Sequence, residues 1–161
     1  MNAPPDDPML GAEANDEGID LREASVLLVD DNRQNLELMQ AYLETLPCTI
    51  RTATDGVEAE ELIRESCPDL ILLDVMMPRM SGFELCQKIK ASPATRDTIV
   101  IMVTALHEVS DLERATESGT DDFLTKPVNK LELLTRVRSL LRVRLLKRRL
   151  DQVLGSGGAA D

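Results

Sequence analysis

Five polar residues of this chain stand at the ends of short apolar runs, where their side chains could act together. Asp30 and Asp31 follow the run SVLLV, Asp74 follows DLILL, Thr104 follows TIVIMV and Lys126 follows DDFLT. A carboxylate with so many apolar neighbours is costly to bury unless something pairs with it. Three carboxylates, a hydroxyl and an ammonium group could together bind a cation and handle an anionic group such as a phosphoryl group.

The elements that must position these residues alternate regularly between apolar runs and amphipathic segments. Because the apolar runs show no alternation, they predict a parallel sheet with both faces covered by helices. Right-handed crossovers favour the strand order 2-1-3-4-5, so the fold class is α/β, a doubly wound five-stranded parallel sheet. Strands are expected at 25–30, 48–54, 69–74, 98–105 and 121–127, and helices at 32–46, 56–66, 81–92, 108–119 and 129 to about 151.

In that order the first, third, fourth and fifth strands are neighbours, so the five polar residues converge at one edge of the sheet. Three like charges a few ångströms apart cannot all stay ionised without counter-ions. Lys126 supplies one positive charge, and a divalent cation would supply the rest. With no His or Cys among the ligands, the site favours Mg²⁺. Asp74, in the centre, is then placed to attack a phosphoryl group and form an aspartyl phosphate.

A plainer interpretation is that these residues only cap strands and form turns, as Asp often does. That interpretation would serve for any one of them and is a poor account of all five at one edge.

The composition bounds the class of protein. The 161 residues suffice for one domain, and a net charge of −11 argues against general nucleic-acid binding. Cys48, Cys67 and Cys86 show no disulfide or zinc spacing and predict reduced thiols in a cytoplasmic protein. No apolar run is long enough to span a membrane.

The sequence predicts three segments. Residues 1–24 are expected to be a disordered, inert acidic tail and residues 25–143 the main domain. Residues 144–161 are expected to form a helical extension that ends in a Gly-rich linker, GSGGAAD.

Residues 25 to 143 closely resemble the receiver domain of bacterial two-component response regulators. The resemblance rests on LLVDDNRQN, DLILLDVMMPRMSGFEL, VIMVTA and DDFLTKP, in that order and spacing. It implies a flavodoxin-like (CheY-like) fold with an extended C-terminal helix, and a domain that catalyses only its own phosphorylation and slow dephosphorylation. A sensor histidine kinase or phosphotransfer protein would be the phosphodonor.

The resemblance also implies a role for each matching residue. Asp74 would be the phosphoacceptor, Asp31 the direct Mg²⁺ ligand and Asp30 a ligand through water, while Met76 would offer its backbone carbonyl. Thr104 and Phe123 would be the switch pair, and Lys126 would pair with the phosphoryl oxygens. The peptide bond from Lys126 to Pro127 would be cis, and the small residue Ala105 would leave the site accessible.

Two other functions compete. One is a constitutive interaction or dimerisation module that keeps the fold without the switch; such modules usually lose an acid or the lysine, and this chain has lost neither. The other is a hydrolase of the haloacid-dehalogenase type, which would want a second acid two residues after the nucleophile, where Met76 stands. The one histidine, His107, is given no role.

A homodimer is also expected from the resemblance, through the fourth helix, fifth strand and fifth helix. Asp121 and Asp122 of one chain would approach Arg136 of the other, with Glu132 on the same helix. Ion pairs of this kind would set register more than affinity. The apolar stripe that continues to Leu150 would contribute more, as a short coiled coil. The bland alternative is that the stripe packs on the sheet as far as Leu141 and then frays.

Overall fold

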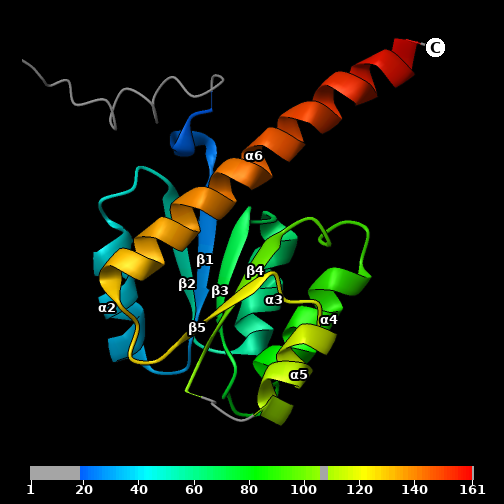
Figure 1. The fold of residues 1–161 in the computed structure, drawn as a ribbon. Coiled ribbons are helices and arrows are strands. Elements are labelled where there is room, and N and C mark those ends of the chain that lie inside the picture. Colours follow the sequence, from blue (N-terminus) through cyan, green and yellow to red (C-terminus); the bar gives the residue numbers. More distant parts are fainter. Residues whose placement is uncertain (1–18, 106–108, 161) are drawn as a thin grey trace, which may run out of the picture.

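Five parallel strands form one sheet in the order β2-β1-β3-β4-β5, as the sequence predicts (Figure 1). The computed structural model describes residues 19–105 and 109–160, with side chains over 19–105 and 113–155. Each strand but the last is followed by a helix that returns the chain for a parallel neighbour. The elements are η2 Leu21–Glu23, β1 Ser25–Val29, α2 Arg33–Leu43, β2 Thr49–Ala53, α3 Gly56–Glu65, β3 Leu70–Asp74, α4 Gly82–Ala91, β4 Ile99–Thr104, α5 Val109–Glu117, β5 Asp122–Thr125 and α6 Lys130–Ala160.

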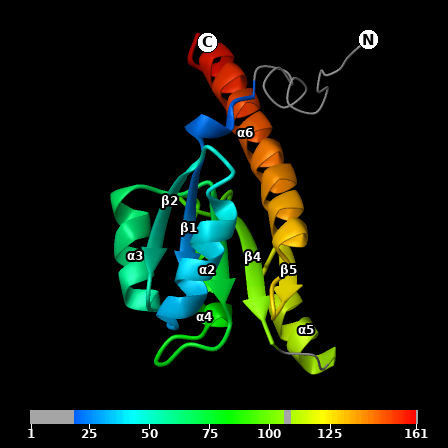
Figure 2. The same cartoon turned by 90° about the vertical axis from the view of Figure 1, so that its left-hand side faces the viewer.

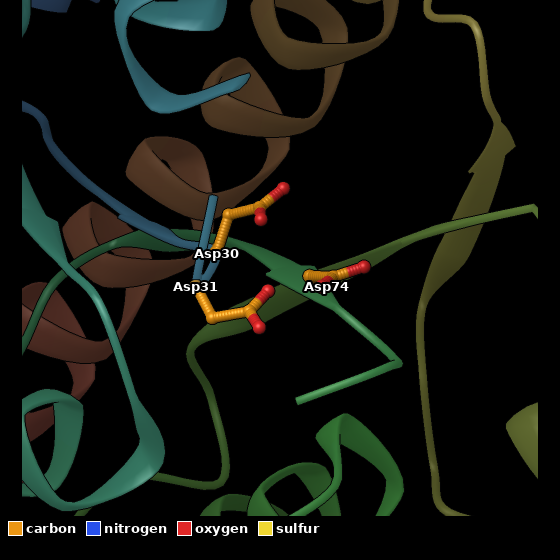
Figure 3. Close-up of side chains that lie close together, drawn as sticks. All are labelled: Asp30, Asp31 and Asp74. Carbon is orange, nitrogen blue, oxygen red and sulfur yellow. The ribbon is translucent and has the colours of Figure 1, made fainter. Parts of the chain in front are cut away.

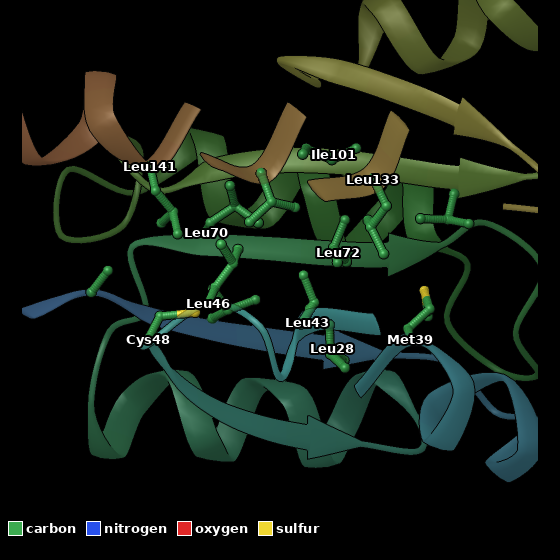
Figure 4. Close-up of a cluster of buried hydrophobic side chains, with 14 of the residues drawn as sticks. Leu28, Met39, Leu43, Leu46, Cys48, Leu70, Leu72, Ile101, Leu133 and Leu141 are labelled. Carbon is green, nitrogen blue, oxygen red and sulfur yellow. The ribbon is translucent and has the colours of Figure 1, made fainter. Parts of the chain in front are cut away.

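Helices α2 and α6 cover one face of the sheet. Successive side chains of a strand point to opposite faces, so alternate residues of β1 and β3, such as Leu28 and Leu72, meet these helices. Leu43 of α2 and Leu133 of α6 reach the same cluster, which Figure 4 shows in close-up. All four side chains are fully buried. Truncating any one of these leucines to Ala should lower the free energy of unfolding by about 2–5 kcal/mol.

Helices α3, α4 and α5 cover the other face. Leu27 and Ile71 point there from β1 and β3, and they meet Ile63 of α3, Phe83 of α4 and Ala115 of α5. Because both faces are covered, β3 in the middle is buried at every residue, including its last, Asp74. This burial is the reason that the strand reads as an unbroken apolar run.

Side-chain caps begin the helices that follow the first three strands. The Asn32 side chain accepts a hydrogen bond from the Asn35 backbone N–H at the start of α2. At the start of α4, Ser81 and Glu84 form a reciprocal capping box, which satisfies two backbone N–H groups that the helix itself cannot. At the start of α3 the Asp55 side chain accepts a hydrogen bond from the Glu58 backbone N–H, as Asn32 does for α2. These caps fix where each of the three helices begins after its strand.

The described fold includes six residues that the sequence analysis assigns to the N-terminal tail. Residues 19–24 were expected to belong to a disordered tail, but Ile19 and Ala24 are buried, at 5% and 1% exposure, and Asp20 caps the 3-10 helix η2. An isolated apolar residue before a strand gives no periodic signal, so its packing could not be foreseen. Residues 1–18 lie outside the described residues.

Helix α6 is longer than the sequence predicts. The glycines of GSGGAAD indicate a linker after about residue 151, whereas α6 continues to Ala160 and extends beyond the sheet (Figures 1 and 2). Nucleation is the costly step of helix formation, and a helix already held on the sheet need only propagate. Each glycine then costs about 1 kcal/mol relative to Ala, which does not by itself end a helix.

Candidate functional site

The carboxyl ends of β1, β3, β4 and β5 bring the five predicted residues to one edge of the sheet. Asp30 directly follows β1, Asp74 ends β3, Thr104 ends β4 and Lys126 directly follows β5. The register of the parallel strands places Asp74 and Thr104 at nearly the same level along the strand direction, because Asp74 is opposite Val103, the residue before Thr104. The Lys126 backbone N–H donates to the Thr104 carbonyl at 2.8 Å, which ties the ends of β4 and β5 together.

The three aspartates form one acidic cluster. Each offers a carboxylate oxygen, and these three oxygens lie within 4.8 Å of one another; Figure 3 shows the three side chains close together. Asp30 and Asp74 are buried, at 0% and 3% exposure, while Asp31 is exposed. Hard carboxylate oxygens at this spacing fit a small divalent cation such as Mg²⁺, and the exposed Asp31 leaves room for the waters that Mg²⁺ retains.

Lys126 is the cation that the structure brings into this cluster. Its Nζ lies 3.0 Å from Asp74 Oδ1 and 3.4 Å from Asp30 Oδ2. Burial alone would lower the pKa of Lys126, but the hydrogen bond to Asp74 and the negative charges of Asp74 and Asp30 outweigh it, and the pKa is raised. Lys126 is therefore charged at neutral pH and bridges the two buried acids.

Asp74 is incompletely compensated. Burial raises the pKa of its carboxyl, and the nearby charge of Asp30 adds to the rise, while Lys126 and the Met76 backbone N–H oppose it. A single ammonium group shared between two buried carboxylates leaves an excess of negative charge. The excess negative charge therefore favours the binding of a further cation at this site.

Sequence reasoning missed the residues that orient Asp30. The Asn32 backbone N–H donates to Asp30 Oδ1 at 2.8 Å, and Asn35 Nδ2 donates to Asp30 Oδ2 at 3.3 Å. Asn32 is the N-cap of α2 and Asn35 lies in its first turn, so the helix start that follows β1 also fixes the acid before it. The available signal was the spacing of two and five residues from Asp30, which places both beside it at a helix start.

The loop between β3 and α4 approaches Asp74 through its backbone. A Cβ at Gly82 would collide with the Asp74 carbonyl oxygen and would come within 2.9 Å of the Val75 Cα, so only glycine fits there. Arg79 in the same loop has a positive φ of 70°, a conformation that non-glycine residues adopt at a cost. Met76 directs its side chain into solvent, at 65% exposure, and leaves its backbone at the site. The predicted cis Lys126–Pro127 bond is present.

The two predicted switch residues differ in burial. Thr104 is 3% exposed at the end of β4. Phe123 is partly buried and packs against the cluster beneath α3, α4 and α5. Its packing agrees equally with an ordinary core residue and with a switch, so its switch role stays a prediction.

The predicted dimer contacts are occupied within a single chain. Arg136 Nη1 lies 2.6 and 2.7 Å from the two oxygens of Asp122, and Arg136 Nη2 lies 3.3 Å from Glu132. Asp121 accepts hydrogen bonds from Lys90 Nζ at 2.8 Å and from the Val100 backbone N–H at 2.7 Å. Within one chain, the Asp122–Arg136 pair therefore joins β5 to α6, and the Asp121–Lys90 pair joins the start of β5 to α4.

The remaining expectations concern residues away from the site. His107 lies outside the described residues. The three cysteines are free thiols; Cys48 and Cys86 are buried and Cys67 is exposed. Within the described part of the chain, no helix is long and apolar enough to cross a membrane.

Comparison with known proteins agrees with this geometry. The family model "Response regulator receiver domain" matches residues 26–138. The response regulator PleD of Caulobacter vibrioides is 44% identical over 134 residues, which are 83% of this chain and 30% of the relative. The DNA-binding dual master transcriptional regulator RpaA of Synechocystis is 39% identical over 117 residues, which are 73% of this chain and 48% of the relative.

Solved structures show the same likeness. The signal receiver domain of a histidine kinase from Syntrophus aciditrophicus superposes with a TM-score of 0.70 at 35% identity, covering 74% of this chain and 90% of that one. An α/β sheet of this order with an acid–lysine cluster at its carboxyl edge defines a class of signalling domain. The chain belongs to the receiver domain family of two-component response regulators. It spans less than half the length of the two curated relatives.

Proposed function

We propose that this domain is a phosphorylation-dependent switch that accepts a phosphoryl group on Asp74 with Mg²⁺ bound. The proposal rests on the groups that surround the Asp74 carboxylate. This carboxylate is buried at 3% exposure, 3.0 Å from the Lys126 ammonium and within 4.8 Å of the Asp30 and Asp31 oxygens. Membership of the family supports two-component signalling, and a histidine kinase or phosphotransfer protein would be the donor.

The proposed transfer uses the residues as follows. One Asp74 oxygen forms a bond to phosphorus while the bond from phosphorus to the donor's histidine nitrogen breaks, and the leaving imidazole keeps the electron pair. Lys126, released from Asp74, pairs with a phosphoryl oxygen, and the Thr104 hydroxyl donates to another. A bound Mg²⁺ supplies positive charge toward the transferring oxygens. Asp30, Asp31, Asp74 and the Met76 carbonyl would hold it.

A mass measurement tests this proposal directly. After incubation with acetyl phosphate and Mg²⁺, the intact protein should gain one phosphate, and Asp74→Asn should gain none. The matched control is Asp97→Asn, because Asp97 precedes β4 at the opposite edge of the sheet, where its exposed side chain pairs with Lys147. Equal labelling of Asp74→Asn would overturn the assignment. No labelling of the native chain would favour a constitutive interaction module.

We also propose that the face made by α5, β5 and α6 pairs with a second copy when Asp74 is phosphorylated. Leu131, in the first turn of α6, is 75% exposed and offers an apolar contact. Because Arg136 already pairs with Asp122 in its own chain, a dimer would have to share or exchange that pair. Light scattering with and without beryllofluoride tests the proposal, and a monomer in both conditions at high micromolar concentration would refute it.

A further inference from the structure

The buried carboxylate of Asp30 has two side-chain donors at one of its oxygens. Asn35 Nδ2 lies 3.3 Å from Asp30 Oδ2, and Lys126 Nζ lies 3.4 Å from the same oxygen. The other oxygen, Oδ1, accepts from the Asn32 backbone N–H at the shorter distance of 2.8 Å. Asp30 is 0% exposed, so these donors replace the water that a carboxylate otherwise binds. Asp30 Oδ2 is therefore shared between a neutral amide and an ammonium group.

The two donors differ in how closely each is tied to Asp30. Lys126 lies nearer to Asp74, at 3.0 Å, and in the proposed phosphoryl transfer it moves to a phosphoryl oxygen. Asn35 belongs to the first turn of α2, and the Asn32 side chain holds its backbone N–H at 3.1 Å. Because Asp74 lies on a different element, a change at Asp74 moves Lys126 and leaves the Asn35 amide beside Asp30.

The space around this contact offers little to replace Lys126 once it moves. A pocket of about 420 Å³ borders Asp30, Asn35 and Lys126. The rest of its lining is mostly apolar, with side chains such as Leu38, Met39, Val103 and Val128. A buried water needs two to four polar partners, and an apolar lining supplies few of them. Without the Asn35 amide, Oδ2 would become a buried charge that has lost both of these donors, which is costly.

We propose, on the basis of the phosphoryl transfer to Asp74 proposed above, that Asn35 is a positioning residue for Lys126. Its amide keeps Asp30 Oδ2 hydrogen-bonded while Lys126 pairs with the phosphoryl group, and so lowers the free-energy cost of moving the ammonium group. Because the amide is neutral, it satisfies the oxygen without cancelling the negative charge that attracts a cation. A lysine or arginine in its place would compete with the cation instead.

Unfolding by urea without Mg²⁺ tests the shared donation by itself. Asn35→Leu keeps the approximate size of the side chain and removes its amide. In the native background Lys126 still donates to Asp30, whereas in the Lys126→Ala background the same substitution leaves Oδ2 without either donor. The urea midpoint should therefore fall at least about 0.5 M further in the Lys126→Ala background. The change in helix propensity is the same in both backgrounds and cancels.

The matched control is Gln34→Leu, because Gln34 is exposed in the same turn of α2. It should shift the urea midpoint equally in the two backgrounds. If Asn35→Leu also shifts the midpoint equally in both, Asn35 only supports the start of α2, and the proposal is overturned.

Beryllofluoride binding tests the proposal in the single variant, where Lys126 is present. This phosphoryl mimic would occupy Asp74 and draw Lys126 away from Asp30. At saturating Mg²⁺, the half-saturating concentration of beryllofluoride should rise about tenfold in Asn35→Leu, because one hydrogen bond to a buried charge is lost. The half-saturating concentration of Mg²⁺ alone should change by less than about threefold. Gln34→Leu should leave both values unchanged. Melting temperatures at graded ligand concentrations measure them.

The outcomes separate the role of Asn35 from the proposed function. Equal beryllofluoride binding by Asn35→Leu and the native chain would overturn the role of Asn35. A loss of Mg²⁺ binding as large as the loss of beryllofluoride binding would overturn it too, because Asn35 would then act on the cation alone. A native chain that does not bind beryllofluoride would refute the proposed phosphorylation of Asp74 and, with it, the role of Asn35 in that reaction. The urea comparison needs no phosphoryl group and would still show whether Asn35 and Lys126 share Asp30.

Discussion

Two buried aspartates stand at opposite ends of β3, and their surroundings differ. Asp69 precedes the strand at 2% exposure, and Asp74 ends it at 3%. Both come from the stretch DLILLD, in which each acid is next to a leucine. Burial and sequence context therefore do not distinguish them. The groups that each carboxylate contacts do.

Asp69 is surrounded by donors. Its Oδ2 accepts from the Ser25 backbone N–H at 2.9 Å, and its Oδ1 lies 2.6 Å from Arg148 Nη1 and 3.5 Å from Arg144 Nε. Positive charges outnumber the acid here, and the residues involved belong to β1 and α6. This aspartate joins the amino edge of the sheet to the far part of α6, which is a structural role.

Asp74 shows the opposite balance. It shares one ammonium group, that of Lys126, with Asp30, and Asp31 is nearby. A buried carboxylate that is fully paired contributes to the fold, whereas one left with excess negative charge can bind a cation and then react. The comparison shows that local charge balance, and not burial, distinguishes Asp69, which pairs within the fold, from Asp74, the acid that we propose to be phosphorylated. Four predictions test this difference, from the largest expected effect to the smallest.

Substitutions at the carboxyl edge of the sheet should lower the phosphorylation rate, and substitutions at the amino edge should not. Asp31→Ala removes a cation ligand, so the rate with acetyl phosphate and Mg²⁺ should fall by about 100-fold or more. Asp69→Asn should leave that rate within about twofold. Time courses of intact mass measure both. A similar loss in the two variants would mean that the edges of the sheet do not differ as described.

Removing the shared cation should destabilise the carboxyl edge. Lys126→Ala leaves Asp30 and Asp74 buried without their ammonium partner, so the free energy of unfolding without Mg²⁺ should fall by about 1–3 kcal/mol. The pKa of Lys126 is raised above its ordinary 10.5, so this stabilisation is present below that pH and is lost only as pH rises through the folded value. Urea titration at pH 7 and pH 8 should give the same loss, and millimolar Mg²⁺ should restore part of it.

Breaking the pairing at the amino edge should loosen α6. Asp69→Asn leaves Arg148 and Arg144 without a carboxylate, with an expected cost of about 1–2 kcal/mol. Amides near residue 148 should exchange faster, which hydrogen exchange with mass spectrometry measures. Asp97→Asn is the control, because the Lys147–Asp97 pair is exposed at 51% and 42% and should contribute less than about 0.5 kcal/mol. An equal loss of stability in Asp69→Asn and Asp97→Asn would contradict a special structural role for Asp69.

Neutralising Asp74 should stabilise the protein. Its pKa is raised from the ordinary 3.8, so the folded state disfavours the ionised form, and stability is lost as pH rises from 3.8 through the folded value. Without Mg²⁺ at pH 7, Asp74→Asn should therefore gain about 1 kcal/mol, and the gain should shrink as the pH is lowered toward 4. Thermal unfolding across that pH range measures it. A destabilised Asp74→Asn would show that Lys126 compensates Asp74 completely.

Much of the site was predictable from sequence because parallel strands impose it. A sheet of order 2-1-3-4-5 must bring the residues after β1, β3, β4 and β5 to one edge, so Asp30, Asp74, Thr104 and Lys126 could be grouped from their place at the ends of apolar runs. The helix caps at Asp55 and Ser81 are local as well. Interactions within a few residues, and those that follow from topology, leave a periodic or positional trace in the sequence.

Only the tertiary structure decided which side chains meet across long separations. Arg148 pairs with Asp69 across 79 residues, Arg136 with Asp122 of its own chain across 14, and Ile19 packs under α6. A basic residue on an amphipathic helix looks the same in sequence whether it faces water, a neighbouring molecule or a buried acid. Its partner depends on the rotation and length of α6 on the sheet, and packing of the whole domain sets both.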